Sequence, residues 1–392
     1  MKRKKILWLC SWYPSRSEPF NGDFIQRHAR AAALFNDIYV IHVYGELNEK
    51  NIKSEDEIHK NPGLTEHIIY YAKTRSLIGK ISSSLKYVSI LKDAIRQYIN
   101  DFDKPDLVHV HIPYKAGIGG LWIKKKYGVP YIVTEHWGIY NKIAEGNYLS
   151  RSPFFKRLVK KVFTKASKFL SVSNFLGSGV NQYVLKKEFE VISNVVDTDL
   201  FFFAKKESGV FRFIHVSNMV PLKNAEGILK AFKLFLSGGN NAELVMVGDT
   251  GVSIRESAMN LNFPDGAVSF RGEVLYASVA EQMQKSDCLV LFSNIENSPC
   301  VIGEALCSGL PVIATHVGGI PELLNHENSI LIQPGDETAL CSAMKKMLDK
   351  YQAFNRNEIA ENAKKKFSYT VIGKKMADTY EAILEKIDKR KF

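Results

Sequence analysis

Short apolar runs alternate with segments of helical period along the chain, and the alternation starts afresh near residue 200. Apolar runs of this length are typical of buried parallel strands, whose two faces are both covered by helices. The pattern predicts strands at 37–45, 106–113 and 169–173, and strands that run on into a loop or turn within 4–14, 127–138 and 189–201. It predicts strands again at 211–218, 242–249, 267–274, 287–293 and 311–315. Helices are expected between them, as at 24–35 and 77–100, whereas 46–66 is predicted to be polar and irregular.

Two successive αβ repeats favour an α/β protein with two doubly wound parallel-sheet domains. A chain of 392 residues also exceeds one typical domain. We place the first domain at 1–198, the second at 199–372 and a final helical segment at 373–392, with 199–210 as the linker. Ligands of such sheets bind at the carboxyl ends of the strands, which is where candidate site residues are sought.

Composition narrows the class of protein. Apolar residues make up 45% of the chain, which excludes a mainly disordered protein. No apolar run reaches the ~18 residues of a transmembrane helix. The start of the chain mimics a signal peptide, but its apolar run is short and no cleavage site follows, so we interpret it as the first strand and expect a cytoplasmic protein. The five cysteines show no metal-ligand spacing.

The net charge of +12 lies entirely in the first half of the chain. Residues 1–200 contain 31 Lys and Arg against 19 Asp and Glu, whereas residues 201–392 contain 22 of each. The segment 151–170 has seven basic residues, no acidic one and an apolar stripe at helical spacing. It predicts either a helix that packs on the sheet with a solvated basic face, or a contact with an anionic membrane surface or phosphorylated acceptor.

The strongest candidate chemistry lies in Ser293–Leu324, where a strand, a loop, a helix and a second strand are expected. Ser298 is the expected N-cap of that helix and Pro299 its first residue. Free N–H groups at a helix start bind anions such as phosphate, and Glu296 and Glu304 bracket this start. The axial rise from Ser298 to Glu304 is roughly 9 Å, about the reach of a diphosphate with a sugar at each end.

Carboxylates would repel a phosphate that touched them, so Glu296 and Glu304 are interpreted as acceptors for sugar hydroxyls on either side of it. This hypothesis predicts a nucleotide-sugar site. The alternative is an ordinary αβ unit with two surface glutamates. Lys223, in a strand-to-helix loop, could reach a diphosphate, and His136 follows a predicted strand. The Asp-x-Asp at Asp197–Asp199 resembles a metal-binding motif, but its place at the domain junction argues against that role.

Several motifs together resemble glycosyltransferase family 4, the retaining enzymes of the GT-B fold. The family's Glu-x7-Glu element is similar to Glu296–Glu304, its next loop to VGGIPELL, its domain junction to SNVVDTDLF and its N-terminal loop to SWYP…NGDF. The resemblance implies two Rossmann-like domains that face a central cleft, with the C-terminal helix crossing back to the first domain. It also implies a site without a metal or other cofactor, with a nucleotide diphosphate sugar as co-substrate.

The family implies roles for matched positions. In the catalytic group, Lys223 would bind the diphosphate, Glu296 the donor sugar and His136 the reacting region. The donor-binding group would comprise Glu304 at the ribose, Gly22 near the diphosphate, backbone at Arg271, Glu273 and Val274 at the base, amides near Pro299, Cys300 and Val301 at the diphosphate, and also Ser298 and Asn218. One departure concerns Asn218, because the family usually has an arginine there and asparagine carries no charge. Arg27 and Lys142 are the candidate replacements, and the sequence does not choose between them.

The resemblance implies a retaining transferase that moves a sugar to a hydroxyl of a glycan or lipid-linked acceptor, in cell-surface polysaccharide or lipopolysaccharide synthesis. The basic first half suits a lipid-linked acceptor at the inner face of the cell membrane. Three alternatives stay open: an epimerase or hydrolase of the same fold, a basic nucleic-acid-binding protein, and a catalytically dead scaffold. The basic residues lack interleaved exposed aromatics, so nucleic acid is not the expected partner.

Overall fold

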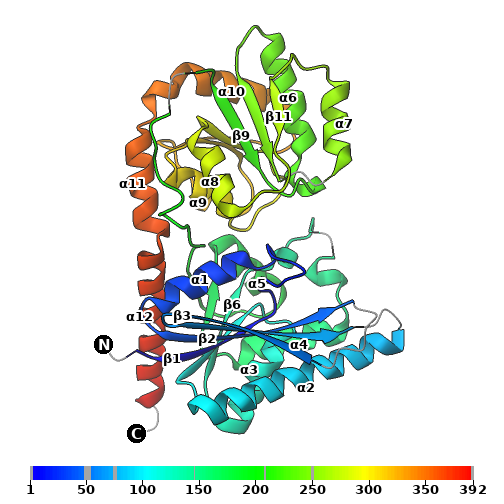
Figure 1. Cartoon of the computed structure of the whole chain (residues 1–392), viewed down its shortest axis with the longest axis vertical. Helices are drawn as coiled ribbons and strands as arrows, with labels where there is room; N and C mark the ends of the chain where they lie inside the picture. Colours follow the sequence, from blue (N-terminus) through cyan, green and yellow to red (C-terminus); the bar gives the residue numbers. More distant parts are fainter. Residues whose placement is uncertain are drawn as a thin grey trace. The chain divides into compact units, whose positions relative to one another are not determined.

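The computed structural model describes residues 3–47, 54–73, 77–144, 146–206, 209–248 and 251–389. The chain forms two compact α/β units (Figure 1). The first contains the described residues up to Val195 and those from Tyr369 onward, and the second contains Val196–Ser368. The boundaries therefore lie at 195/196 and 368/369 rather than at 198/199 and 372/373. A backbone bond from Val196 N–H to the Phe367 carbonyl (2.9 Å) ties both ends of the second unit together.

In the described part of the chain, the first unit holds an eight-stranded sheet in the order β3-β4-β2-β1-β5-β6-β7-β8. Its neighbouring strands are parallel except β3 and β4, which are antiparallel. The strands are β1 (Lys5–Cys10), β2 (Asp37–Glu46), β3 (Ser54–Asn61), β4 (Leu64–Ala72), β5 (Leu107–His111), β6 (Tyr131–Glu135), β7 (Phe169–Ser171) and β8 (Phe189–Val191). The helices are α1 (Asp23–Ala33), α2 (Leu77–Phe102), α3 (Ala116–Tyr127), α4 (Pro153–Lys165), α5 (Asn174–Tyr183) and α12 (Tyr369–Asp388).

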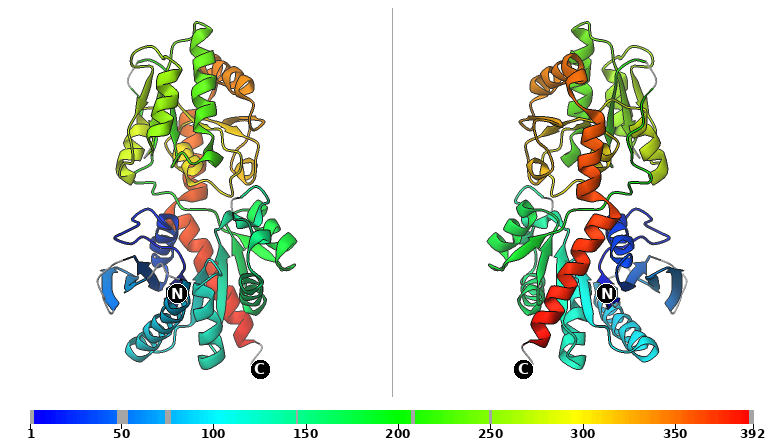
Figure 2. Two further views of the ribbon diagram at one scale, coloured as in Figure 1. Left: turned by 90° about the vertical axis from the view of Figure 1, so that its right-hand side faces the viewer. Right: turned by 90° about the vertical axis from the view of Figure 1, so that its left-hand side faces the viewer.

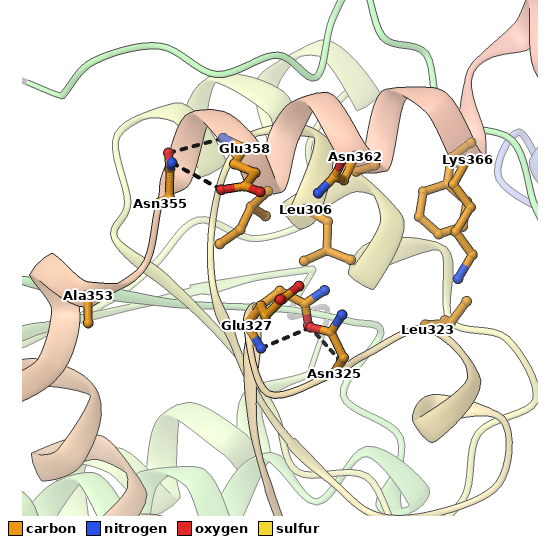
Figure 3. Close-up of a pocket in the computed structure, with 13 residues that line it drawn as sticks. Leu306, Leu323, Asn325, Glu327, Ala353, Asn355, Glu358, Asn362 and Lys366 are labelled. Atoms are coloured by element: carbon orange, nitrogen blue, oxygen red, sulfur yellow. Dashed lines mark hydrogen bonds between the residues drawn. The ribbon is translucent and has the colours of Figure 1, made fainter.

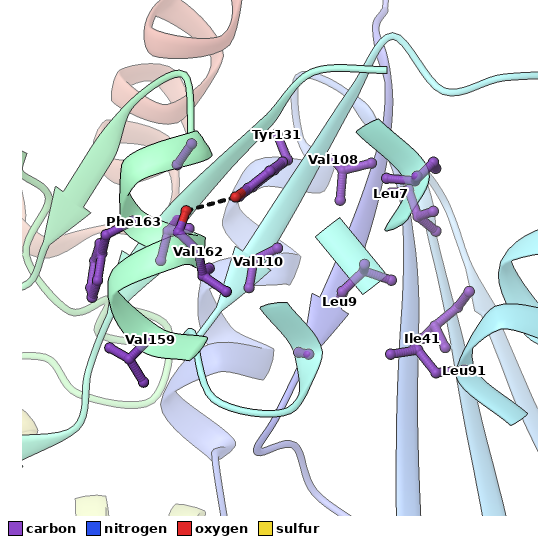
Figure 4. Packing of buried hydrophobic residues seen from close by; sticks show 14 of the residues in the cluster. Leu7, Leu9, Ile41, Leu91, Val108, Val110, Tyr131, Val159, Val162 and Phe163 are labelled. Carbon is purple, nitrogen blue, oxygen red and sulfur yellow. Dashed lines mark hydrogen bonds between the residues drawn. The ribbon is translucent and has the colours of Figure 1, made fainter. Parts of the chain in front are cut away.

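The central strand β1 is buried on both faces, as its continuous apolar run predicts. Leu7 and Leu9 face a core shared with α2, α3 and α4, where they pack near Val110 and Tyr131 (Figure 4). Ile6 and Trp8 face the opposite core, which α1 and α12 cover. Helices on both faces thus exclude water from five of the six residues of the strand.

The helix α12 belongs to the first unit although it follows the second unit in sequence. It lies beside α1 (Figure 2), so closely that a Cβ added at Gly373 would lie 2.1 Å from the Ala31 carbonyl oxygen. The Tyr380 hydroxyl is 2.8 Å from His109 Nδ1 of β5. The last helix is therefore an integral part of the first unit's core.

The second unit holds an all-parallel six-stranded sheet among its described residues, in the order β11-β10-β9-β12-β13-β14. The strands are β9 (Arg212–Val216), β10 (Glu243–Val247), β11 (Val268–Phe270), β12 (Cys288–Leu291), β13 (Val312–Thr315) and β14 (Ser329–Ile332). One face is covered by α6 (Ala225–Ser237), α7 (Val252–Asn260) and α10 (Glu337–Lys350). The other is covered by α8 (Tyr276–Gln284), α9 (Cys300–Cys307) and α11 (Arg356–Phe367).

The segment 46–66, expected to be irregular, instead contributes an antiparallel hairpin of β3 and β4 within the described residues. β3 is almost entirely exposed, so it has no apolar pattern to reveal it, and its strand conformation depends on pairing with β4. In α4 the apolar stripe of Phe155, Val159, Val162 and Phe163 is buried in the core. The prediction that 151–170 contains a helix packed on the sheet is therefore correct for the apolar face of α4.

Candidate active site

The loop between β12 and α9 is fixed by bonds from its neighbours. The Thr315 hydroxyl donates to the Ser293 carbonyl (2.6 Å), and the Asn294 N–H donates to the Leu222 carbonyl (2.8 Å). The helix α9 begins at Cys300, with Pro299 rather than Ser298 as its N-cap. The predicted Ser298 cap is wrong, because Pro299 has extended backbone (φ −67°, ψ 120°) and the helical conformation starts only after it. Gly309 ends the helix in the predicted left-handed conformation (φ 70°).

Lys223 and Glu296 form an ion pair at the carboxyl edge of the second sheet. The Lys223 ammonium lies 2.5 Å from Glu296 Oε1, and the Ser293 hydroxyl donates to the same oxygen (2.8 Å). Both charged side chains are sheltered, with 25% of the Lys223 side chain and 9% of the Glu296 side chain exposed. The fold therefore brings together two of the three residues predicted to be catalytic, and it adds Ser293, whose hydroxyl orients the carboxylate.

Glu304 lies one helical turn into α9 and is buried. Its Oε1 accepts a hydrogen bond from the Tyr276 hydroxyl (2.9 Å), and the Tyr276 ring packs against Phe201 at 4.9 Å between centroids. Tyr276 comes from the start of α8, 28 residues earlier, and no sequence motif marks it. The carboxylate of Glu304 is thus held in one orientation before any ligand binds.

Gly318 is required by the close approach of two loops. It has φ +56°, and a Cβ added there would lie 1.8 Å from the Glu296 carbonyl oxygen. The neighbouring Gly319 N–H donates to that same carbonyl (3.0 Å). The VGGIPELL loop therefore fixes the backbone of Glu296.

We expect Gly318→Ala to lower the transfer rate about tenfold, because the added methyl group must push the Glu296 backbone out of place. Steady-state kinetics with the preferred donor would measure the loss. Gly239→Ala is the matched control, since Gly239 also has positive φ but nothing lies within 4 Å of the added Cβ. An equal loss in both variants would show that backbone strain alone, and not the displaced Glu296, causes the effect.

The remaining donor candidates also follow strands of the second sheet. Asn218 is exposed after β9, in a loop held by Ser217, whose hydroxyl is 2.7 Å from His215 Nε2 and accepts the Met219 N–H (3.0 Å). The segment containing Arg271, Glu273 and Val274 follows β11, and the Arg271 N–H donates to the carbonyl of Met246 in β10 (2.9 Å). Pro299, Cys300 and Val301 form the start of α9.

His136 and Gly22 lie in the first unit, whereas Lys223, Glu296 and Glu304 lie in the second. Gly22 has φ +77° and caps α1, and an added Cβ there would lie 2.7 Å from the Tyr13 backbone nitrogen. His136 follows β6, with its ring centroid 5.1 Å from that of Phe24, two residues after Gly22. The two candidates of the first unit are therefore connected through Phe24.

His136 belongs to a cluster of buried histidines with His28, His109 and His111. Its Nε2 is 3.1 Å from His111 Nδ1, and its Nδ1 has no partner among the described residues. Burial, reinforced by neighbouring histidines, holds the pKa of His136 well below its usual range, and it lowers the pKa of His28 to about 4. The His136 ring is therefore neutral at pH 7 and can exchange hydrogen bonds with hydroxyl groups without carrying charge. His109 and His111 are fully buried and form part of the core of the first unit.

Glu135, which sequence reasoning missed, holds the backbone around His136. Its Oε1 accepts the N–H groups of His136 and Trp137 (both 2.9 Å), and its Oε2 accepts the Tyr140 hydroxyl (2.7 Å). Burial raises the pKa of Glu135 from 4.5 to about 7, in opposition to these hydrogen bonds, which lower it. A buried acid thus fixes the loop that carries a candidate catalytic residue.

This raised pKa predicts a pH-dependent stability. Between pH 4.5 and about 7 the unfolded chain releases the Glu135 proton that the folded state keeps, so the free energy of unfolding is highest below pH 4.5, falls as the pH rises through this range and levels off above about 7. The Glu135→Gln variant cannot ionise at this position. We therefore expect its free energy of unfolding, measured relative to that of the native chain, to be about 3 kcal/mol higher above pH 7 than in acid. Urea unfolding across pH would measure this, and the histidine contributions cancel in the comparison. Parallel curves for the two proteins would contradict it.

A separate cavity of about 340 Å³ lies between α11, the far end of α9 and the loop before β14 (Figure 3). The residues that line it include Asn325, Glu327, Glu358, Asn362 and Lys366. None of the predicted site residues is among the described residues of this lining. Among the described residues, no group of three or more His, Cys, Asp or Glu side chains could hold a metal ion. None of the helices in the described ranges is both long enough and apolar enough to cross a bilayer.

Two family models match the chain, one in each unit. The model described as "Glycosyltransferase Family 4" matches residues 53–200, and "Glycosyl transferases group 1" matches residues 210–350. N-acetyl-alpha-D-glucosaminyl L-malate synthase of Bacillus anthracis is 27% identical over 293 residues, which are 71% of this chain and 74% of that protein. TuaC of Bacillus subtilis, described as a glycosyltransferase of teichuronic acid biosynthesis, is 25% identical over 365 residues, with 87% and 88% covered.

Solved structures share the fold. Sucrose-phosphate synthase from Thermosynechococcus elongatus aligns with a TM-score of 0.77 at 16% identity, over 97% of this chain and 100% of that one. Anabaena HepE in complex with UDP aligns with a TM-score of 0.70 at 18% identity, over 96% and 100%. These likenesses and the two parallel-sheet units confirm the predicted fold. The chain belongs to glycosyltransferase family 4 and adopts the GT-B fold.

Proposed function

We propose that this glycosyltransferase moves a sugar, with retention of anomeric configuration, from a nucleotide diphosphate sugar to a hydroxyl of a glycan or lipid-linked acceptor. The observation that carries the donor class is the arrangement of Lys223, Glu296 and Glu304 around the start of α9. A cation and the N–H groups at a helix start suit the diphosphate, and the two carboxylates suit sugar hydroxyls.

The relatives support this donor and acceptor class. HepE has been solved with UDP-glucose, and TuaC is described by teichuronic acid biosynthesis. Alpha-monoglucosyldiacylglycerol synthase of Streptococcus pneumoniae, named for a glycolipid product, is 25% identical over 53% of this chain. These names support a role in the synthesis of cell-surface polysaccharide or glycolipid. We propose in addition that the reaction takes place at the inner face of the cell membrane.

In the proposed mechanism the leaving nucleoside diphosphate gains negative charge as the glycosidic bond breaks. Lys223 and the N–H groups at the start of α9 stabilise this charge, and Glu296 orients the donor sugar. The acceptor hydroxyl attacks from the face that the diphosphate leaves, and the departing phosphate takes its proton. Since Lys223 supplies the positive charge, we propose that the reaction needs no metal, and transfer should persist in the presence of EDTA.

A thermal-shift screen against UDP-, GDP- and ADP-sugars tests the donor class. We expect one nucleotide series to stabilise the protein, and Glu304→Ala to abolish that shift. No shift with any nucleotide sugar would overturn the proposal.

Product analysis separates transfer from the alternative activities. Incubation with the donor alone should leave it largely intact, whereas a hydrolase or epimerase would consume or convert it without an acceptor. NMR of the transferred sugar should show the donor's anomeric configuration, and an inverted product would contradict retention.

A further inference from the structure

The surface of the first unit around α4 combines strong positive charge with protruding apolar side chains. Between Gly146 and Lys187 the sequence contains nine Lys and Arg and no Asp or Glu. An ordinary solvated surface mixes both signs of charge. This 42-residue segment therefore differs from the rest of the chain, whose second half is neutral.

The basic side chains lie on the outer face of α4. Since Phe155, Val159 and Val162 are buried against the sheet, the positions between them face outward. Phe154, Arg157, Lys160, Lys161 and Lys165 are all exposed. Phe154, Arg157 and Lys161 follow one another at the three- and four-residue spacing that places side chains on one helical face. The exposed face thus begins with a phenylalanine and continues with cations.

Three large apolar side chains are exposed in the first turn of this helix and in the segment that leads into it. Phe154 is 72% exposed, Ile143 56% and Leu149 51%. Leu149 is held next to α4, because its carbonyl accepts a hydrogen bond from the Lys156 ammonium (2.7 Å). The loop with Ile143 is closed by Asn147, whose amide donates to the Lys142 carbonyl (3.1 Å). The backbone beside Ile143 and at Leu149 is therefore fixed by specific hydrogen bonds, while the two side chains stay exposed.

A buried aromatic base supports these protruding residues. Tyr148 and Phe155, next to Leu149 and Phe154, are buried and their rings lie 6.2 Å apart between centroids. The Arg151 guanidinium stacks over the Trp137 ring at 5.0 Å, which joins this region to the residue after His136. The surface therefore continues from the carboxyl edge of the first sheet, where His136 lies.

Cations on the outer face of α4 have no acidic partner nearby. Among the described residues, no carboxylate pairs with Lys156, Arg157, Lys160, Lys161 or Lys165. Their charge is thus available to an external anionic partner. A nucleic acid or an acidic protein would use the charge but would leave the protruding apolar side chains in water. A bilayer with anionic headgroups satisfies both, since cations meet the headgroups and apolar side chains enter the acyl region.

We propose that Ile143, Leu149, Phe154, Arg157, Lys160 and Lys161 form a docking surface, the α4 docking surface, for an anionic lipid bilayer. The apolar side chains insert, whereas the buried stripe of α4 takes no part because it packs on the sheet. The inference deepens the proposed function, for it names the partner of the acceptor side and the residues that contact it. Docking would hold the edge with His136 at the membrane that carries the acceptor.

Vesicle co-sedimentation without donor or acceptor tests the docking surface independently of catalysis. The full chain should bind vesicles of phosphatidylcholine with phosphatidylglycerol and not vesicles of phosphatidylcholine alone. Lys160→Gln with Lys161→Gln should weaken binding by about fivefold for each lysine, and so roughly 25-fold together. Phe154→Ser should weaken it roughly tenfold.

Matched controls come from exposed residues of the second unit. Lys345→Gln with Lys346→Gln removes two adjacent exposed lysines of α10, and Met259→Ser removes an apolar side chain that is also 72% exposed. Neither control should change vesicle binding. Equal binding by the α4 variants and the native chain would overturn the proposal. So would binding of an RNA or DNA oligonucleotide that the lysine substitutions abolish, together with no binding to vesicles.

The failure of docking and the failure of the proposed transfer are distinguishable. If only docking is wrong, the nucleotide-sugar thermal shift and its loss in Glu304→Ala persist. If docking is right, the α4 variants should keep the native rate with a short, water-soluble acceptor and lose it with acceptor embedded in anionic vesicles. An equal rate loss with both acceptors would overturn the docking role and place these residues in catalysis.

Discussion

Replacing Lys223 by alanine is expected to lower kcat about 10²–10³-fold. The Lys223 ammonium lies 2.5 Å from Glu296 Oε1, beside the start of α9, and in our mechanism it meets the charge that grows on the leaving diphosphate. That charge is larger in the transition state than in the bound donor, so the loss should fall on kcat more than on KM. Steady-state kinetics with the preferred donor would separate the two.

The removal of Lys223 also leaves the sheltered Glu296 carboxylate without its cation, so stability must be recorded beside activity. Lys223→Arg keeps the charge and should retain part of the rate. Lys230→Ala removes an exposed lysine of the following helix and should leave kcat unchanged. A Lys223→Ala enzyme with native kcat and a raised KM would contradict the proposed transition-state role.

Replacing Asp287 by alanine is expected to destabilise the second unit by about 3–5 kcal/mol. This buried carboxylate contacts the Lys206 ammonium and lies 3.9 Å from the Arg356 guanidinium. It also accepts the Arg212 N–H (2.8 Å) and the Tyr351 hydroxyl (3.1 Å). Its loss leaves two sheltered cations without an anion and a backbone N–H without an acceptor. Urea unfolding of the full chain would show an earlier transition for the second unit.

Asp287→Asn keeps an acceptor for the Arg212 N–H and removes only the charge, so its effect should be smaller than that of alanine. Asp349→Ala removes an exposed carboxylate of α10 and serves as the matched control. A loss below about 1 kcal/mol for Asp287→Ala would show that water replaces the carboxylate as it does at a surface ion pair.

The parallel strands were predictable because burial on both faces leaves a continuous apolar run in the sequence. The strand β1 is the clearest case, with five of its six residues buried. β3 could not be found in this way, because its SEDEIHKN sequence lies at the exposed edge and gains its structure from β4. An edge strand has no apolar alternation when neither of its faces is covered, so its local sequence does not predict a strand.

The candidate site could be predicted only for the residues that the sheet topology brings together. Lys223 and Glu296 are 73 residues apart, yet both follow parallel strands, and the carboxyl ends of such strands share one edge. Tyr276 and Glu135 could not be predicted, because each acts through hydrogen bonds that depend on where the folded chain places its side chain. The Ser298 cap failed because Pro299 took the cap position itself.

The position of α12 has a consequence for the order in which the domains mature. Ile372, Met376 and Tyr380 complete the core of the first unit, and Tyr380 meets His109 across 271 residues of sequence. On the ribosome, all of Val196–Ser368 emerges before α12 does. The core of the N-terminal domain therefore stays incomplete, with an apolar face exposed, until the C-terminal domain has been synthesised. The domain that is synthesised first is thus the last to complete its fold.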